Sequence, residues 1–145
     1  MFGKIALSAA LAMSMASVSF AETINWTATL DQSQEADQMV PAKGAMGAAA
    51  GTLDTETGKM TYSITYEGLS GDPAAAHFHG PAAKGSDAAP VVTLGVDGNF
   101  ASPMVGEAMA TPEQVKDSEA GLWYINIHTA ANPKGEIRGQ VEKAM

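Results

Sequence analysis

Apolar and polar residues alternate along several short stretches of this chain, a pattern typical of β-strands with one buried face. The first stretch covers residues 24–30, where every second side chain, from Ile24 onward, is apolar. Residues 60–67 alternate in the same way, and they follow a turn-forming stretch at 55–58 with residues 51–54 before it. Two such segments around a short turn that contains Gly predict a β-hairpin.

The end of the chain predicts a second hairpin. Residues 122–129 carry large apolar side chains at alternate positions, and residues 136–142 return after a turn at 130–135. The side chains expected to face inward are Trp123, Ile125, Ile127, Ile137, Gly139 and Val141. A further apolar strand is expected at residues 91–96.

One short helix interrupts the strands. Thr111, Pro112 and Gln114 match a helix start, because Thr serves as the N-cap, Pro suits the first helical position and Gln closes a capping box. We expect this helix to end near Gly121.

Two stretches in the first half are less regular. Residues 31–39 are polar and indicate a loop, whereas residues 40–50 are rich in Ala and Gly and fit either a flexible connection or a weak strand. Many short alternating strands separated by turns, with one short helix, indicate an all-β sandwich or barrel.

The N-terminus has the features of a secretory signal peptide. One lysine precedes an apolar run at residues 5–18, and Ser19 and Ala21 place small side chains at the −3 and −1 positions of a cleavage site. A membrane anchor is the alternative, but the run is shorter than the roughly 20 residues that span a bilayer. We therefore expect residues 1–21 to be removed and residues 22–145 to form a single periplasmic or secreted domain with no membrane span.

The composition narrows the classes of function. Eight Lys and Arg residues against sixteen Asp and Glu residues give a formal net charge of −8. An acidic surface repels phosphate backbones, so nucleic-acid binding is not expected. The chain has no Cys, which excludes disulfides and thiolate metal sites. It also lacks the Gly-x-Ser-x-Gly and phosphate-loop motifs, so no nucleophilic enzyme site stands out.

The three histidines are the best candidates for chemistry. His77 and His79 lie two residues apart in an extended segment, so both side chains leave one face of a strand while Phe78 points the other way. His128 belongs to the polar face of residues 122–129. If the two strands are neighbours, the imidazoles converge on a site for Cu(II) or Zn(II) with a position left for another ligand. The alternative is that they are ordinary surface histidines or bond to backbone groups.

The terminal hairpin supplies residues that would surround such a site. If the hairpin turn is symmetric, His128 faces Glu136 and Asn126 faces Arg138. Glu136 would then accept a hydrogen bond from the second ring nitrogen of His128, as metal-bound imidazoles usually require. The alternative is a polar pairing that only keeps this face solvated, with Glu136 and Arg138 in an exposed salt bridge that contributes little.

Three segments carry a family resemblance. The His-x-His-Gly-Pro stretch of residues 77–82, the strand ending in His-Thr at 121–129 and the Gly-Glu-Ile-Arg-Gly-Gln stretch within 133–140 together resemble the chordin-type (CHRD) domain family. The resemblance covers nearly all of the chain after the signal peptide. It implies a Greek-key β-sandwich like those of immunoglobulins and copper-zinc superoxide dismutases. In animals the family occurs in extracellular proteins that bind growth factors, and its stand-alone bacterial members are exported.

The sandwich resemblance bears on the histidines. Copper-zinc superoxide dismutases also place a His-x-His pair on one strand and a further copper ligand on a late strand, and His77, His79 and His128 match that order. The chain has no fourth His and no Cys, so a complete copper-zinc dismutase site is absent. The likeness implies a mononuclear site, with copper as the cofactor and zinc as the alternative.

Together these observations predict an exported protein that holds one copper ion through three histidines, for binding, buffering or delivery rather than turnover. The alternative is a non-catalytic interaction or structural module of the cell envelope that meets a protein partner and holds no metal. Geometry separates the two readings. Ring nitrogens within a few Å of a common point favour a metal, and histidines more than about 10 Å apart exclude one.

Overall fold

The computed structural model describes residues 20–37 and 44–145, and strands dominate these ranges. The strands are β1 (Thr23–Asp31), β2 (Met46–Asp54), β3 (Lys59–Glu67), β4 (Pro73–His79), β5 (Pro90–Thr93), β6 (Met104–Met109), β7 (Tyr124–Thr129), β8 (Ile137–Gln140) and β9 (Glu142–Lys143). An α-helix, α1 (Pro112–Glu119), and a 3-10 turn, η1 (Gln32–Gln34), complete the described part of the chain.

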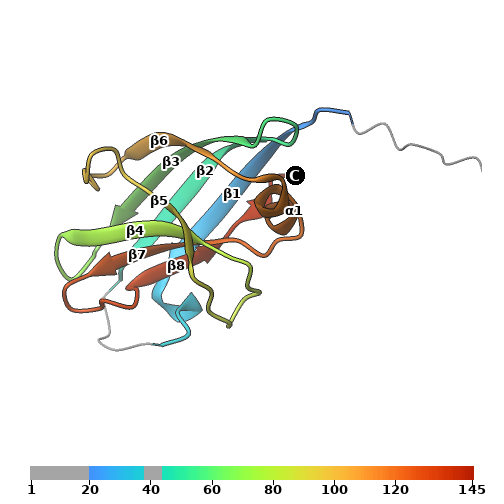
Figure 1. Ribbon diagram of the computed structural model, residues 1–145. Coiled ribbons are helices and arrows are strands. Elements are labelled where there is room, and N and C mark those ends of the chain that lie inside the picture. Colours follow the sequence, from blue (N-terminus) through green and yellow to red (C-terminus); the bar gives the residue numbers. More distant parts are fainter. Residues whose placement is uncertain (1–19, 38–43) are drawn as a thin grey trace, which may run out of the picture.

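The strands form a sheet that folds back on itself. Their order is β5-β4-β7-β8-β1-β2-β3-β6, and β9 pairs with β1. Only one residue pair, Asp31 with Arg138, joins β1 to β8. The half containing β1, β2, β3 and β6 therefore packs against the half containing β4, β7 and β8 (Figure 1). The predicted all-β sandwich with one short helix is confirmed, and its Greek-key connection pattern stays a prediction.

Aromatic side chains join the two layers. Phe78 of β4 makes edge-to-face contacts with Trp26 of β1, at 5.6 Å between ring centroids, and with Tyr62 of β3, at 6.1 Å. It also lies against Trp123, at 5.5 Å, and all four side chains are buried. Phe78 is thus the core-facing residue of its segment. Because successive side chains of a strand point to opposite faces, the two flanking histidines point away from this core.

The strands predicted in the first half are confirmed. Exposed and buried residues alternate along β1, and β3 buries every second side chain from Met60 to Ile64. The β2–β3 hairpin pairs Leu53 with Met60. Within the Ala- and Gly-rich stretch, residues 46–50 belong to β2 and are not a flexible connection. Residues 38–43 lie outside the described part of the chain.

The terminal hairpin has the predicted register. Asn126 pairs with Arg138, and Tyr124 pairs with Gln140. The return strand is divided, however, and does not run unbroken through residues 136–142. β8 ends at Gln140, and the next residues cross to the other layer, where β9 pairs with β1.

The helix begins as its sequence predicts. The Thr111 side chain accepts a hydrogen bond from the Gln114 backbone N–H, and the Gln114 side chain accepts one from the Thr111 N–H. The helix ends at Glu119, with Ala120 as its C-cap. This reciprocal capping satisfies two backbone donors that an isolated helix start would leave unpaired.

Two other strands differ from their predictions. β5 ends at Thr93, short of the predicted 91–96, because the chain turns at Gly95, whose φ of 83° is left-handed. β6 was not predicted at all. Its apolar side chains Val105 and Met109 are exposed, so its hydrophobic pattern does not report a buried face.

The predicted signal peptide, residues 1–21, falls almost entirely outside the described residues. Among the helices of the described ranges, none combines the length and the apolar character needed to cross a membrane. Expectations about processing and location therefore remain those of the sequence.

Candidate metal centre

His77, His79 and His128 come from two adjacent strands. In the β4–β7 ladder His79 lies opposite Tyr124, and His77 lies opposite Asn126, two residues before His128. Residues that are opposite or diagonal on one face of an antiparallel ladder lie within side-chain reach. The two strands are therefore neighbours, as the convergence of the histidines requires.

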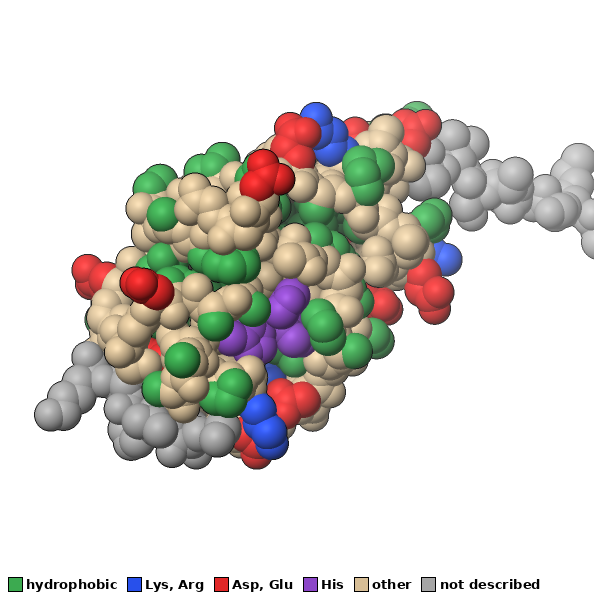
Figure 2. Space-filling view, turned by 60° about the vertical axis from the view of Figure 1, so that its left-hand side comes forward, with side chains coloured by type: hydrophobic (Ala, Val, Ile, Leu, Met, Phe, Trp, Pro, Cys, Tyr) green, Lys and Arg blue, Asp and Glu red, His purple; other side chains and the backbone are tan. Residues whose placement is uncertain are grey.

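The three imidazole rings form one cluster. Their candidate ligand nitrogens all lie within 4.8 Å of one another. Nδ1 of His77 lies 3.2 Å from Nε2 of His128. Figure 2 shows the histidine side chains gathered at one place on the surface. His79 is 8% exposed, whereas His77 and His128 are partly exposed, so the cluster has one buried member and two that reach solvent.

Backbone carbonyls determine the proton positions on two of the rings. Nδ1 of His79 donates to the Ala88 carbonyl at 2.9 Å, and Nδ1 of His128 donates to the Pro133 carbonyl at 3.0 Å. A carbonyl oxygen can only accept, so each Nδ1 carries a proton and Nε2 of the neutral ring keeps its lone pair. Metal-binding histidines commonly have their other nitrogen bonded in this way.

Nε2 of His79 is one of four buried side-chain polar atoms without a partner in the described part of the chain, and it belongs to the cluster. Buried polar atoms are normally paired. Nitrogens bound tetrahedrally to one zinc ion at about 2.0–2.1 Å lie roughly 3.4 Å apart. The His77–His128 separation of 3.2 Å is near that value, and the ligand nitrogens of all three rings lie within 4.8 Å of one another. The cluster is therefore compatible with metal binding.

All three imidazoles have a pKa below the ordinary value of 6.5. Burial is the largest cause in each case, since it disfavours the charged ring. The neighbouring His79 lowers the pKa of His77 further, whereas the carbonyl hydrogen bonds of His79 and His128 oppose the lowering. The rings are neutral at neutral pH, which is the form that binds metal.

The polar face around the histidines is covered by loop residues. Tyr124, Asn126 and Arg138 are 2%, 3% and 1% exposed. The Ala88 N–H donates to the Tyr124 hydroxyl, and Arg138 donates to the Ala83 carbonyl. The alternation of residues along β7 predicts a polar face correctly, but the loop between β4 and β5 makes that face an interior surface.

Glu136 does not support His128 in the predicted way. The regular β7–β8 ladder ends before Glu136, so the alternation of faces no longer determines where its side chain points. Its carboxylate is buried and accepts hydrogen bonds from Ser70, Thr129 and Asn132. Burial favours a higher pKa for Glu136, but these hydrogen bonds outweigh it and lower the pKa. The structure corrects the prediction: the Pro133 carbonyl, and not this carboxylate, binds the His128 proton.

Arg138 lies beside the cluster but does not form the exposed salt bridge with Glu136 that was its alternative role. Its side chain is buried, and its ion pair is with Asp87, at 3.3 Å between Nη1 and Oδ1. The guanidinium carbon lies 3.6 Å from the centroid of the Tyr124 ring. The exposed salt bridge with Glu136 that the sequence allowed is thus replaced by a buried stacking contact.

Asn126 lies beside the cluster and bonds to a carboxylate from a distant segment. Its Nδ2 donates to both oxygens of Glu35, at 2.9 Å each. Burial raises the pKa of Glu35 to about 7, and Asn126 and Arg138 act in the opposite direction. Residues 31–39 were predicted only as a polar loop, because no local sequence pattern connects Glu35 with Asn126.

Other residues of the site were also missed. The carbonyls of Ala88 and Pro133 leave no trace in a sequence, because every residue has a carbonyl. Tyr124 shares the polar face of β7 with His128, as alternation predicts, but no sequence pattern showed that its ring stacks on His79.

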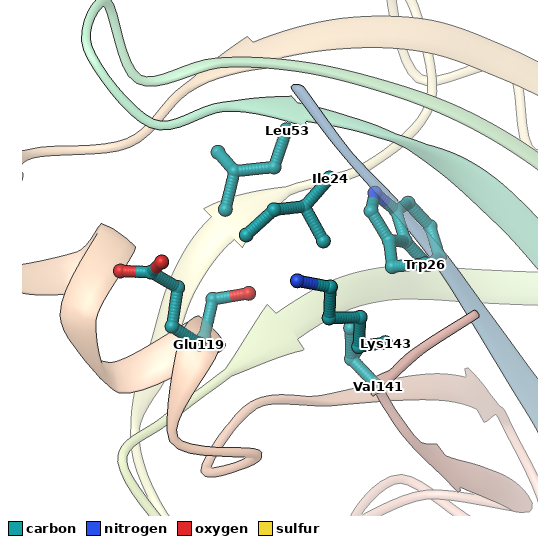
Figure 3. Close-up of a pocket in the computed structure, with 7 residues that line it drawn as sticks. Ile24, Trp26, Leu53, Glu119, Val141 and Lys143 are labelled. Atoms are coloured by element: carbon teal, nitrogen blue, oxygen red, sulfur yellow. The ribbon is translucent and has the colours of Figure 1, made fainter. Parts of the chain in front are cut away.

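A separate pocket lies away from the histidines, where α1 meets the sandwich (Figure 3). Its lining includes Ile24, Trp26, Leu53, Glu119, Val141 and Lys143. The lining is mainly apolar and contains none of the three histidines. It therefore does not compete with the cluster as a metal site.

One of three comparisons with known proteins identifies a family. A comparison with protein families matches residues 26–141 to the CHRD domain. Searches of curated proteins and of solved structures found no match. The matched range covers most of the chain and includes all three histidines, so the resemblance seen in the sequence is confirmed. The chain belongs to the CHRD domain family.

Proposed function

We propose that this protein binds one transition-metal ion through His77, His79 and His128, and that copper is the ion it holds. The observation that carries the proposal is the convergence of three neutral imidazoles with ligand nitrogens within 4.8 Å of one another. Nε2 of His79 supports the proposal further, because it is buried and has no hydrogen-bond partner among the described residues. A metal ion would supply the partner that this nitrogen lacks.

The donor set favours copper or zinc. Imidazole nitrogens suit both ions, and copper(II) binds nitrogen sites most tightly among the divalent first-row metals. The chain contains no Cys, so no soft thiolate donor directs the choice elsewhere. Zinc is the alternative ion, because three histidines and an open fourth position also suit tetrahedral zinc.

The role that fits best is holding and releasing the ion. His77 and His128 are partly exposed, so an ion can reach the cluster and leave it without unfolding the sandwich. The nearby carboxylate of Glu136 is engaged by its own hydrogen bonds and does not face the cluster as a base. Binding, buffering or delivery therefore needs fewer additional features than catalytic turnover.

The setting we propose is outside the cytoplasm. The apolar run and small residues before position 22 have the form of a secretory signal. A periplasmic or secreted location would expose the site to metal ions outside the reducing cytoplasm.

A second candidate is a metal-free interaction module, possessing the same fold. The observation that favours it is the hydrogen bond between His77 and His128, which joins the two rings without an ion. In that reading the cluster only stabilises the β4–β7 face, and the loops meet a protein partner of the cell envelope.

The deciding experiment measures metal content and affinity of the untagged purified protein. The protein is loaded in turn with Cu(II), Zn(II) and Ni(II) and examined by native mass spectrometry and competition titration. The test variant is His77→Ala with His128→Ala, and the control is Glu107→Gln, which alters an exposed ion pair with Lys59 in the opposite layer. One tightly bound copper ion that the double variant loses and the control keeps supports the proposal. No stoichiometric ion, or equal binding by the double variant, overturns it in favour of the interaction module.

A further inference from the structure

Three flat groups from three adjacent strands form a continuous stack at the buried side of the cluster. The His79 ring from β4 lies against the Tyr124 ring from β7, with 4.8 Å between centroids and 10° between planes. The Arg138 guanidinium from β8 lies over the Tyr124 ring at 3.6 Å. Cross-strand register produces this order, because His79 pairs with Tyr124, and Arg138 pairs with the residue two positions after Tyr124.

The loop between β4 and β5 holds both rings of the stack through one residue. The Ala88 carbonyl accepts the Nδ1 proton of His79 at 2.9 Å, and it lies 3.2 Å from the Tyr124 hydroxyl. The Ala88 N–H lies 3.0 Å from the same hydroxyl. Rotation of the His79 ring would break a hydrogen bond and a stacking contact together, so both interactions favour the same ring orientation.

Arg138 is itself held in place from several sides. It is 1% exposed, forms its ion pair with Asp87 and donates to the Ala83 carbonyl at 3.2 Å. A further hydrogen bond reaches Gln140 on its own strand, at 3.4 Å. A buried guanidinium with these partners acts as a rigid plate, and a cation over the face of an aromatic ring is attracted to it.

The three histidines are therefore held in two different ways. His77 and His128 bond to each other, so Nδ1 of His77 and Nε2 of His128 are already occupied. His79 is clamped from behind, with its Nε2 unpartnered within the described residues. For a metal ion, the lone pair on Nε2 of His79 is already oriented. His77 and His128 must first give up the hydrogen bond between them before both can bind the ion.

We propose that Tyr124 and Arg138 are positioning residues that hold His79 with its proton on Nδ1 and its Nε2 lone pair ready to receive the metal. This inference rests on the proposed function for its purpose, but its structural content can be tested without metal. Pre-orientation lowers the cost of binding, because the ring does not have to be ordered when the ion arrives. Loss of the stack leaves the imidazole present but free to turn.

The first test uses the metal-free protein. Nitrogen-15 NMR of the imidazoles reports which nitrogen of each ring carries the proton. We expect wild-type His79 to show a single Nδ1–H tautomer and Tyr124→Phe, which keeps the ring, to stay near it. Tyr124→Leu and Arg138→Met should give averaged His79 signals from both tautomers. An unchanged His79 tautomer in both of these variants overturns the proposal.

Internal controls show whether the variants still fold. The tautomer of His128, set by Pro133 outside the stack, should remain Nδ1–H in every variant. Glu142→Gln, which removes an exposed ion pair to Lys84 in the same loop, should leave His79 unchanged. If Arg138→Met does not fold, Asp87→Asn replaces it as the test variant. This change removes the ion pair of the Arg138 guanidinium at an exposed residue.

The second test separates this inference from the proposed function. Metal affinity should fall about tenfold to a hundredfold in Tyr124→Leu and Arg138→Met, as it does when partners of metal ligands are removed. Tyr124→Phe should restore most of the affinity that Tyr124→Leu loses. If the wild-type protein binds no metal, the proposed function is overturned. The positioning role still holds in that case, provided that the two variants show the changed His79 tautomer. Equal metal affinity and equal copper spectra in wild type and both variants overturn the positioning role alone.

Discussion

Nδ1 of His77 lies 3.2 Å from Nε2 of His128, across the ladder that joins β4 to β7. Since Nδ1 of His128 already donates to Pro133, its Nε2 has no proton and must accept. The proton between the two rings therefore belongs to His77. In the metal-free protein this hydrogen bond joins His77 to His128, whereas Nε2 of His79 has no partner within the described residues.

Metal binding should reverse the tautomer of His77. An ion between the rings replaces the shared proton, so Nδ1 of His77 becomes a ligand and the proton moves to Nε2. Nitrogen-15 NMR during a Zn(II) titration should show His77 change from Nδ1–H to Nε2–H while His79 and His128 keep theirs. A zinc-loaded protein in which His77 still carries its proton on Nδ1 would show that the ion does not bind between these rings.

Glu136→Gln should weaken the fold and leave the metal site intact. The buried carboxylate accepts from Ser70, Thr129 and Asn132, and an amide replaces one acceptor oxygen with a donor. We expect a loss of about 2 to 4 kcal/mol in the free energy of unfolding. Denaturant unfolding measures this loss, and competition titration should show metal affinity within about twofold of wild type. A large loss of affinity in a folded variant would restore the predicted link between Glu136 and His128.

Glu35→Gln should change how stability depends on pH. Burial raises the pKa of Glu35 from 4.5 to about 7, so the folded protein retains this proton over a range in which the unfolded chain has lost it. The wild-type free energy of unfolding should therefore fall, relative to the variant, as pH rises from 4.5 through 7. After allowance for solvent screening the difference is about 1 to 2 kcal/mol. Parallel stability curves for the two proteins between pH 4.5 and 8 would contradict the prediction.

The histidines should have the opposite effect to Glu35 on the pH dependence of stability: they make the metal-free protein less stable as pH falls. Their pKa values are lower in the folded protein than the ordinary 6.5, so the unfolded chain takes up protons first as pH falls. Their contribution to stability is fully present above about pH 6.5 and declines below it. Thermal or denaturant unfolding of wild type and of a variant with all three histidines changed to Gln measures this difference. Equal dependence on pH from 7 to 5 in both proteins would exclude it.

The same lowering extends metal binding toward acidic pH. Protons compete with metal for the ring nitrogens, and a lower pKa makes them weaker competitors. Copper affinity should therefore persist below pH 6.5 and decline only as the folded-state imidazoles become protonated. A steep loss of affinity already above pH 6.5 would indicate that the cluster does not bind as a neutral set.

Much of the fold follows from local patterns. Alternation along β1 and β3, the turn between β2 and β3, and the capping residues of α1 each depend on residues close together in the chain. The register of the terminal hairpin also follows from its turn, as the pairing of Asn126 with Arg138 shows. β6 was not predicted, because its apolar residues Val105 and Met109 are exposed and so do not mark a buried face.

By itself the sequence determined that His77, His79 and His128 lie on non-core strand faces, because side chains in a strand alternate and Phe78 occupies the core position between the first two. Only the tertiary structure decided what surrounds them. The loop carrying Ala88 folds over β7 and buries Tyr124 and Arg138, and the end of the ladder lets Glu136 turn away from His128. These contacts join segments far apart in the chain, and backbone carbonyls have no residue type to reveal them. Alternation can therefore place a ligand on a face, but long-range packing decides its proton, its neighbours and its burial.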